Sequence, residues 1–111
     1  MRFAPALVAL SLAAAVSAAP ARADDPSFTL IIKDHKYSPE TLEVPANVKV
    51  KLIVQNQDST PEEFESSSLH REKVVPGGKE ITVNIGPLKP GSYEFIGDFH
   101  RATAHGTIVA K

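Results

Sequence analysis

"VKVKLIVQ", residues 48–55, is the stretch that decides the fold class. Aliphatic residues recur at every second position, which is the period of a β-strand rather than of a helix. Lys49 and Lys51 occupy alternate positions, so the predicted strand has one face in the core and one in water. Four further segments, rich in β-branched, apolar or aromatic residues, are also predicted strands: residues 28–33, 80–85, 92–96 and 106–110.

Prolines and glycines separate these segments at intervals that suit turns between short strands. The pattern predicts a single all-β domain, an antiparallel sandwich or a small barrel. Residues 34–39 are predicted to form a turn or loop, and residues 57–76 the longest loop. A helical turn is expected only at residues 66–73, within that loop.

The first residues have the pattern of a secretory signal peptide. Met1-Arg2 is positively charged, residues 6–19 are apolar or small, and Ala21-Arg22-Ala23 fits a cleavage site. The apolar run is too short to span a bilayer comfortably, which argues against a transmembrane anchor. We therefore expect residues 1–23 to be removed on export, residues 24–111 to form the domain, and the bacterial periplasm to be its location.

The composition narrows the classes of function. The chain has 12 basic and 13 acidic residues and a net charge of −1, and loss of Arg2 and Arg22 would make it more negative. This balance argues against nucleic acid as a partner. The sequence contains no cysteine, so it offers neither disulfides nor a thiolate metal ligand.

Most of the predicted domain resembles one family, the cupredoxins. The resemblance implies a Greek-key β-sandwich that holds copper at one end. Its sequence pattern is carried by residues 37–46, 48–56, 76–78, 88–95 and 106–109.

The same resemblance points to particular ligand positions. The positions of the family's Cys, His and Met ligands near the carboxyl end fall on Gly97, His100 and His105, and that of the earlier His falls on Glu62. A blue-copper centre is therefore not expected, because its copper–thiolate bond defines it. Imidazoles nevertheless occupy two of the four positions.

The remaining donors are nitrogen and oxygen atoms. Such a set suits copper, iron or zinc, and Cu(II) is generally held most tightly among divalent first-row ions, so Cu(II) is expected first and iron second. A site rich in oxygen also favours the oxidised ion. The candidate ligands are Glu63, Glu65, Asp98, His100 and His105, with Glu62, His35 and His70 as second-rank candidates.

Each candidate also has a purely structural interpretation. The four histidines, His35, His70, His100 and His105, could be solvated surface side chains, and His70 could pair with Glu72. Asp98 could order the turn before the last strand through backbone hydrogen bonds. Glu62 and Glu63 could form a charged stretch that protects a sheet edge.

A narrower resemblance lies in Phe64-Glu65, residues 71–78 and residues 97–100, which are similar to the small periplasmic proteins that accompany bacterial iron permeases. It implies a copper- or iron-binding accessory that assists ferrous iron oxidation or transfer, with an iron permease or another uptake component as partner. Whether two copies pair as a homodimer is left open. The alternative function is a metal-free module that contacts a membrane partner through residues 57–76. An enzyme is disfavoured, because no nucleophile–base pair stands out.

Overall fold

The computed structural model describes residue 22 and residues 24–111, so the predicted signal peptide lies almost wholly outside the described residues. Within the described part, no helix has the length and apolar character needed to cross a membrane. The described residues form one 3-10 helix, η1 (Asp98–His100), and these strands: β1 (Ser27–Lys33), β2 (Lys36–Ser38), β3 (Thr41–Val44), β4 (Val50–Asn56), β5 (Glu62–Ser66), β6 (Arg71–Val75), β7 (Glu80–Ile85), β8 (Gly91–Gly97) and β9 (His105–Ala110).

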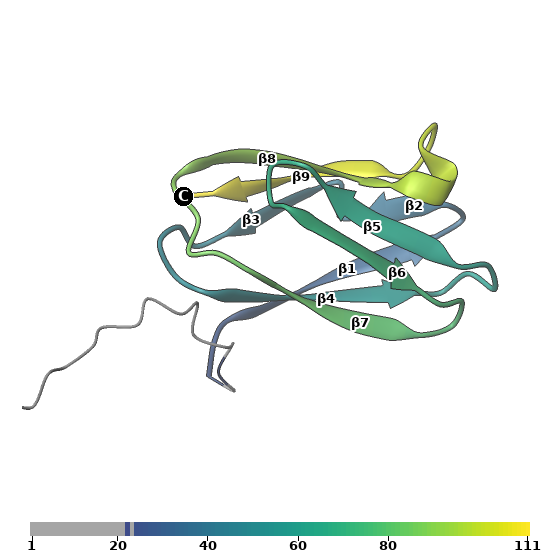
Figure 1. Ribbon diagram of the computed structural model, residues 1–111, viewed down its shortest axis with the longest axis horizontal. Coiled ribbons are helices and arrows are strands. Elements are labelled where there is room, and N and C mark those ends of the chain that lie inside the picture. The colour runs from purple at the N-terminus through teal and green to yellow at the C-terminus, as the bar shows by residue number, and fades with distance from the viewer. Residues whose placement is uncertain (1–21, 23) are drawn as a thin grey trace, which may run out of the picture.

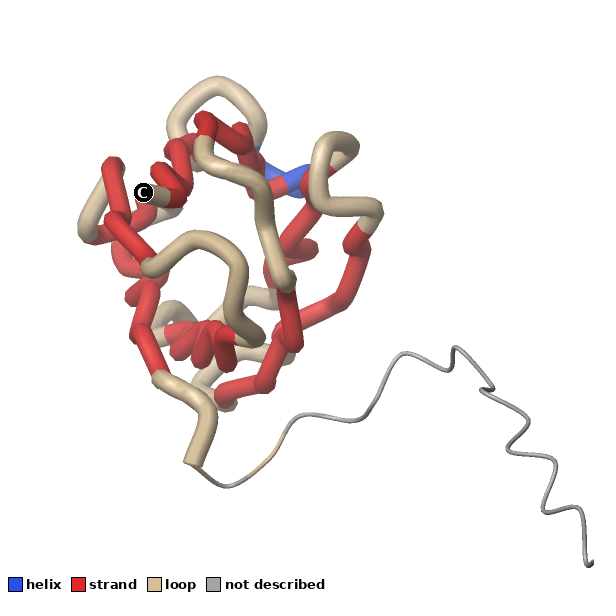
Figure 2. Tube along the Cα trace, turned by 90° about the vertical axis from the view of Figure 1, so that its left-hand side faces the viewer, coloured by secondary structure: helices blue, strands red, loops and turns tan. Residues whose placement is uncertain are grey.

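The strands form two sheets that face each other across a common core. One sheet has the order β2-β1-β4-β7 and the other the order β3-β9-β8-β5-β6. Figure 1 shows the two layers from the side, and Figure 2 shows the strands surrounding the interior when the molecule is seen along its length. The predicted all-β Greek-key sandwich is confirmed.

Pairing within the sheets is mixed, whereas the sequence pattern predicted antiparallel strands. β1 runs parallel to β4, and β3 runs parallel to β9. The reason is that the chain crosses from one sheet to the other between β2 and β3. As a result, β1 and β3 each pair with a strand that is distant in sequence. Short-range turn signals report only the antiparallel neighbours.

The alternation of residues 48–55 sets the position of β4. Val50, Leu52 and Val54 are buried against the facing sheet, as predicted. Val48 was expected on the same face, but it precedes the strand and is 43% exposed. The core also contains three packed aromatic side chains, Tyr37, Phe64 and Phe95, with ring centroids 4.9–6.3 Å apart.

Residues 57–76 are not one long loop, because they contain the hairpin β5–β6. Glu62 pairs with Val75 and Ser66 pairs with Arg71, and the predicted helical turn at residues 66–73 is absent. The inward side of β5 carries Glu62, Phe64 and Ser66, of which two are polar. This composition hides the period of two from a search for apolar alternation. Residues 36–38 and 41–44 are likewise short strands that the sequence pattern did not reveal.

Candidate metal centre

Three segments far apart in the sequence meet at one end of the sandwich. They are the turn between β1 and β2, the loop at residues 57–61, and η1 with the residues that follow it (Figure 1). Buried Asn56 orders the middle segment: its side-chain amide donates to the carbonyl oxygens of Thr60 (2.8 Å) and Val75 (3.1 Å), and its oxygen accepts from the Asp58 N–H (3.0 Å). We call this end of the molecule the site pole.

At the site pole, a buried carboxylate holds an imidazole. Glu62 is 1% exposed and its Oε2 lies 2.5 Å from Nδ1 of His100, whose side chain is 24% exposed. Oε1 of Glu62 accepts the backbone N–H groups of Glu63 (3.0 Å) and Phe99 (2.9 Å). In the tautomer that carries its proton on Nδ1, His100 donates to this carboxylate, and Nε2 is the ring nitrogen that does not contact Glu62.

Gly97 makes room for that carboxylate. A Cβ on Gly97 would lie 2.6 Å from Cδ of Glu62 and 2.7 Å from Cβ of Ala104, closer than real Cβ atoms approach other atoms. The Glu62 carboxyl group therefore occupies the space in which a side chain at position 97 would begin.

His35 reaches the site pole from an unusual turn. Asp34 and His35 both have positive φ, 52° and 56°. That conformation disfavours a side-chain-bearing residue by about 1–2 kcal/mol. Three hydrogen bonds hold the turn: the Asp58 carboxylate accepts the N–H groups of Asp34 (2.8 Å) and His35 (3.0 Å), and the Thr103 hydroxyl donates to the His35 carbonyl (2.6 Å).

The rings of His35 and His100 are stacked on each other. Their centroids lie 3.5 Å apart and their planes differ by 13°. The only other polar contact of the His35 ring within the described residues is a 3.4 Å approach of Nε2 to the Thr60 hydroxyl. The site pole thus presents two adjacent imidazoles, one fixed by Glu62 and the other held only through its backbone.

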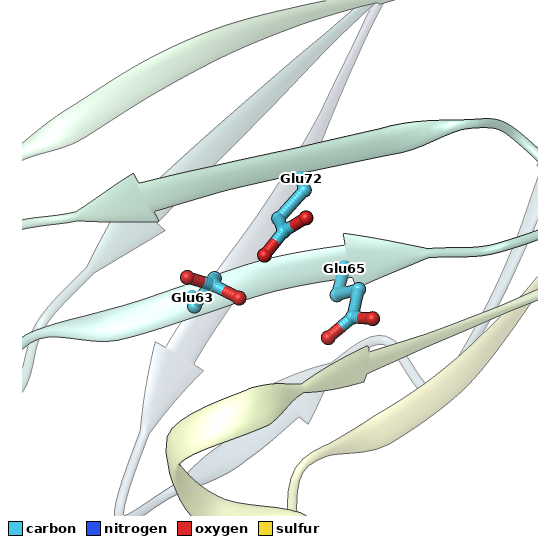
Figure 3. Close-up of side chains that lie close together, drawn as sticks. All are labelled: Glu63, Glu65 and Glu72. Atoms are coloured by element: carbon cyan, nitrogen blue, oxygen red, sulfur yellow. The ribbon is translucent and has the colours of Figure 1, made fainter.

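A second cluster lies on the outer face of the β3-β9-β8-β5-β6 sheet. Glu63 and Glu65 come from β5 and Glu72 from β6, and Figure 3 shows their carboxylates gathered on one side of the two strands. One oxygen of each lies within 4.8 Å of the others. A hydrogen bond with Glu72, partial burial and the neighbouring negative charges raise the pKa of Glu63 to about 6. We call these residues the carboxylate triad.

Asp98 and Arg101 border the carboxylate triad. Arg101 forms an ion pair with Asp98 and lies 3.8 Å from an oxygen of Glu65. The negative charge of Asp98 also contributes to the raised pKa of Glu63. Asp98 and the triad therefore share one electrostatic environment, which Arg101 partly neutralises.

The two imidazoles that the sequence grouped together, His100 and His105, are separated. His105 starts β9 and points to the outer face, whereas Ala104 before it is buried. In the register of the sheet, His105 is opposite Ile96, Ile96 is opposite Glu65, and Glu65 is opposite Glu72. His105 is therefore two strands from Glu65, about 10 Å away given the usual spacing of strands.

His70 lies at the far end of the β5–β6 hairpin, in the turn at residues 67–70, away from the site pole. The structure thus brings Glu63, Glu65 and Asp98 to one side of the sheet and Glu62, His100 and His35 to the other. Sequence reasoning missed Glu72 and Asp58 as parts of these clusters. Only the pairing of β5 with β6, or the fold of the β1–β2 turn, could have revealed them.

Residues 6–110 match the family described as the cupredoxin-like domain. The chain belongs to this family. A protein of Rickettsia prowazekii (strain Madrid E), named only as uncharacterized protein RP394, is 52% identical over 82 residues, which are 74% of this chain and 66% of that protein. The chain spans just under two thirds of that relative's length.

Solved structures share the cupredoxin-like architecture at low sequence identity. A copper binding protein solved by NMR in its apo form is 18% identical with a TM-score of 0.67, covering 77% of this chain and 86% of that one. Auracyanin A, a "blue" copper protein of Chloroflexus aurantiacus, is 12% identical with a TM-score of 0.65, covering 77% of this chain and 98% of its own. At these identities the likeness establishes the fold alone.

A blue-copper centre does not fit this cupredoxin-like chain. The sequence has no cysteine to supply the thiolate that such a centre requires. At Gly97, to which the resemblance assigns that thiolate, the Glu62 carboxyl group occupies the space of a side chain. His100 directs Nδ1 to Glu62 and not to an open position. A metal ion would instead have to be held by surface donors at the site pole or by the carboxylate triad.

Proposed function

We propose that the protein is an exported, periplasmic metal-binding accessory of an iron-uptake system, which assists ferrous iron oxidation or passes iron to a permease. The carboxylate triad is the observation that carries this proposal. Its three carboxylate oxygens lie within 4.8 Å of one another on an accessible face, close to Asp98. In this proposal iron is the cargo, and Glu63, Glu65 and Glu72 are the residues that hold it.

The chemistry of the donors supports this assignment. Carboxylate oxygens suit hard cations and stabilise Fe(III) relative to Fe(II). A hydrogen bond with Glu72, partial burial and neighbouring negative charges raise the pKa of Glu63, and a bound cation would relieve the repulsion among these charges. Arg101 provides a mobile countercharge, because its side chain is 65% exposed and can leave Glu65 when a cation arrives.

Two further observations support the location and the partner. The amino-terminal pattern at residues 1–23 is that of a signal peptide. Phe64-Glu65, which is similar to a stretch of iron-permease accessory proteins, forms part of the β5–β6 hairpin that carries the triad. The face that would hold iron is thus made from the residues that support the resemblance.

The proposal is tested by calorimetric titration of the metal-free protein with Fe(II) under anaerobic conditions, with Fe(III)-citrate and with Cu(II). We expect saturable iron binding that is lost in a Glu63→Gln, Glu72→Gln variant. Glu94→Gln is the matched control, because Glu94 is an exposed glutamate outside the triad on strand β8 of the same sheet. Iron binding that is absent, or unchanged in the double variant, would contradict the proposal.

A second experiment addresses the cellular role. Deletion of the gene should slow iron uptake at low iron concentration, and cell fractionation should find the protein in the periplasm. A protein that binds no metal but is captured with a membrane component would instead favour the metal-free module.

A further inference from the structure

We infer that His35 and His100 form a nitrogen-donor site for Cu(II) at the site pole, separate from the carboxylate triad. Glu62 is a positioning residue of this site and does not bind the ion. The inference depends on the geometry of four side chains and is independent of the proposed iron site.

The first argument is the orientation of His100. Metal-binding histidines usually donate their second ring N–H to a carboxylate or carbonyl group, which fixes the tautomer and the direction of the ring. His100 has this arrangement, because Nδ1 is 2.5 Å from the Glu62 carboxylate, which leaves Nε2 as the ring nitrogen available to an ion. Glu62 is itself fixed by two backbone N–H groups, so the imidazole is held before any ion arrives.

The second argument is the placement of His35. A two-residue turn with positive φ at both positions is most easily formed by glycine or asparagine. Here the turn consists of Asp34 and His35, and hydrogen bonds from Asp58 and Thr103 compensate for its conformation. Such an over-determined backbone places the His35 ring 3.5 Å from the His100 ring. A requirement for an imidazole at this point explains why the turn does not use a more favourable residue.

The third argument is electrostatic. Two carboxylates lie beside the pair: Glu62 contacts the His100 imidazole, and Asp58 accepts the backbone N–H of His35. Within the described residues, neither of them forms an ion pair with a lysine or arginine. A divalent cation bound between neutral imidazoles would balance these two negative charges. Lysine or arginine at the same place would exclude it.

The donor type selects the ion. Two imidazole nitrogens with water as the remaining ligands suit Cu(II), which such sites hold more tightly than the other divalent first-row metals. The stacked rings do not yet point at one ion, so binding requires the His35 side chain to turn. Only a 3.4 Å contact with Thr60 opposes that turn within the described structure. His100 stays in place, since Glu62 holds it.

The experiment uses the purified protein without a histidine tag and Cu(II) alone as the probe. Electron paramagnetic resonance of the copper-loaded protein should show coupling to two imidazole nitrogens. His35→Gln should reduce this to one, and His35→Gln, His100→Gln should remove it with most of the affinity. Glu62→Gln should weaken Cu(II) binding by about 10–100-fold, the usual effect of losing such a positioning group.

Three controls make the result decisive. His105→Gln and His70→Gln remove imidazoles outside the pair and should leave both the spectrum and the affinity unchanged. Because Glu62 is buried and its variant could unfold, His35→Gln, in an exposed turn, tests the site without disturbing the core. The Glu63→Gln, Glu72→Gln variant should keep the copper signal.

The outcomes separate the two sites. Full Cu(II) affinity in the His35→Gln, His100→Gln variant, or a spectrum without two coupled nitrogens in the unmodified protein, would overturn this inference and leave the iron site standing. Loss of iron binding with an intact two-nitrogen copper spectrum would overturn only the proposed function.

Discussion

The carboxyl carbon of Glu62 lies 2.6 Å from the point at which a Cβ on Gly97 would sit. One residue has thereby taken the space of the other's missing side chain. The resemblance assigns the family's thiolate ligand to position 97, where glycine has no side chain and the buried Glu62 carboxyl group fills the space. The same carboxylate lies 2.5 Å from the His100 imidazole, so Glu62 supports His100 from the space next to Gly97.

Substitution of Gly97 should destabilise the fold through crowding alone. Gly97 has φ of −96°, which any residue can adopt, so Gly97→Ala introduces no backbone strain. The added methyl group must displace Glu62 or Ala104, and such overpacking typically lowers the free energy of unfolding by about 1–3 kcal/mol. Urea denaturation measures the loss.

Gly78→Ala is the control for the Gly97 variant. Gly78 has φ of +70° and no atom within 4 Å of an added Cβ, so its substitution reports strain without crowding. Gly97→Ala should also weaken the contact between His100 and Glu62, which changes the NMR signals of the imidazole. A Gly97→Ala protein with unchanged stability and unchanged imidazole signals would show that Glu62 and Ala104 do not pack closely against Gly97.

Asp58 should be a stabilising residue although it lies far from the core. Asp58→Ala removes the acceptor for two backbone N–H groups of the β1–β2 turn. Loss of a hydrogen-bond partner of this kind lowers the free energy of unfolding by about 1–3 kcal/mol. Asp58→Asn retains one acceptor oxygen and should cost less. If both variants unfold at the same denaturant concentration as the original protein, the turn does not depend on this carboxylate.

The contribution of Asp58 should also depend on pH. Partial burial opposes ionisation, yet hydrogen bonds from His35 and Asp34 and the nearby imidazoles produce a net lowering of the Asp58 pKa from 3.8. A carboxyl group whose pKa is lower in the folded state stabilises the fold above its unfolded pKa, and this stabilisation disappears as the pH falls through the folded pKa. The difference in free energy of unfolding between the original protein and Asp58→Asn should therefore shrink as the pH falls through the folded-state pKa of Asp58.

Much of the fold could be predicted from the sequence because the core strands alternate cleanly. Val50, Leu52 and Val54 repeat with period two and are buried, so β4 was identified to within two residues at its start. β5 could not be identified in this way, since its inward face carries Glu62 and Ser66 beside Phe64. Glu62 contacts residues of η1, and Ser66 donates a hydrogen bond to a carbonyl of β8. Local periodicity in the sequence does not reveal these contacts.

The site was predicted only in part, for a related reason. Spacing along the chain grouped His100 with His105, but a strand places successive side chains on opposite faces and η1 changes the direction of the chain between them. The partners that His100 does contact, Glu62 and His35, are 38 and 65 positions away along the sequence. Such contacts arise from the pairing of strands. The sequence therefore allowed the candidate residues to be named, but it did not reveal which of them lie together.

The carboxylate triad should make the protein less stable as the pH rises through the range between about 4.5 and 6. The pKa of Glu63 is raised to about 6 from 4.5 by a hydrogen bond with Glu72, partial burial and neighbouring charges. The folded state then binds a proton more tightly than the unfolded state, so the free energy of unfolding falls as that proton is lost. Denaturation midpoints measured across this pH range should show the decrease.

Glu72→Gln tests the origin of that pH dependence. The variant removes one negative charge from the triad, so the decrease between about pH 4.5 and 6 should flatten and the protein should be more stable than the original near pH 7. Glu94→Gln on strand β8 should retain the original profile. An unchanged profile in Glu72→Gln would mean that the triad does not act as one group.

Arg71 and Lys73 should protect an open side of the sandwich. β6 and β7 are the edge strands of different sheets, and their backbones do not pair. Arg71 Nε donates to the Asn84 carbonyl (2.9 Å) and Lys73 Nζ to the Thr82 carbonyl (3.3 Å), so two side chains occupy acceptors on the β7 edge that another strand could otherwise use. Arg71→Ala, Lys73→Ala should lower the free energy of unfolding by about 0.5–1.5 kcal/mol for each lost hydrogen bond.

The more specific expectation concerns association of the folded chain. With the β7 carbonyls uncovered, the double variant should self-associate at concentrations where the original protein does not, as measured by light scattering and by size-exclusion chromatography. Lys33→Ala, Lys36→Ala removes two charges from the β1–β2 hairpin and leaves the contacts of Arg71 and Lys73 intact, so it controls for loss of positive charge. Equal association of the two variants would assign the effect to net charge, whereas association of the first alone would assign it to the exposed edge.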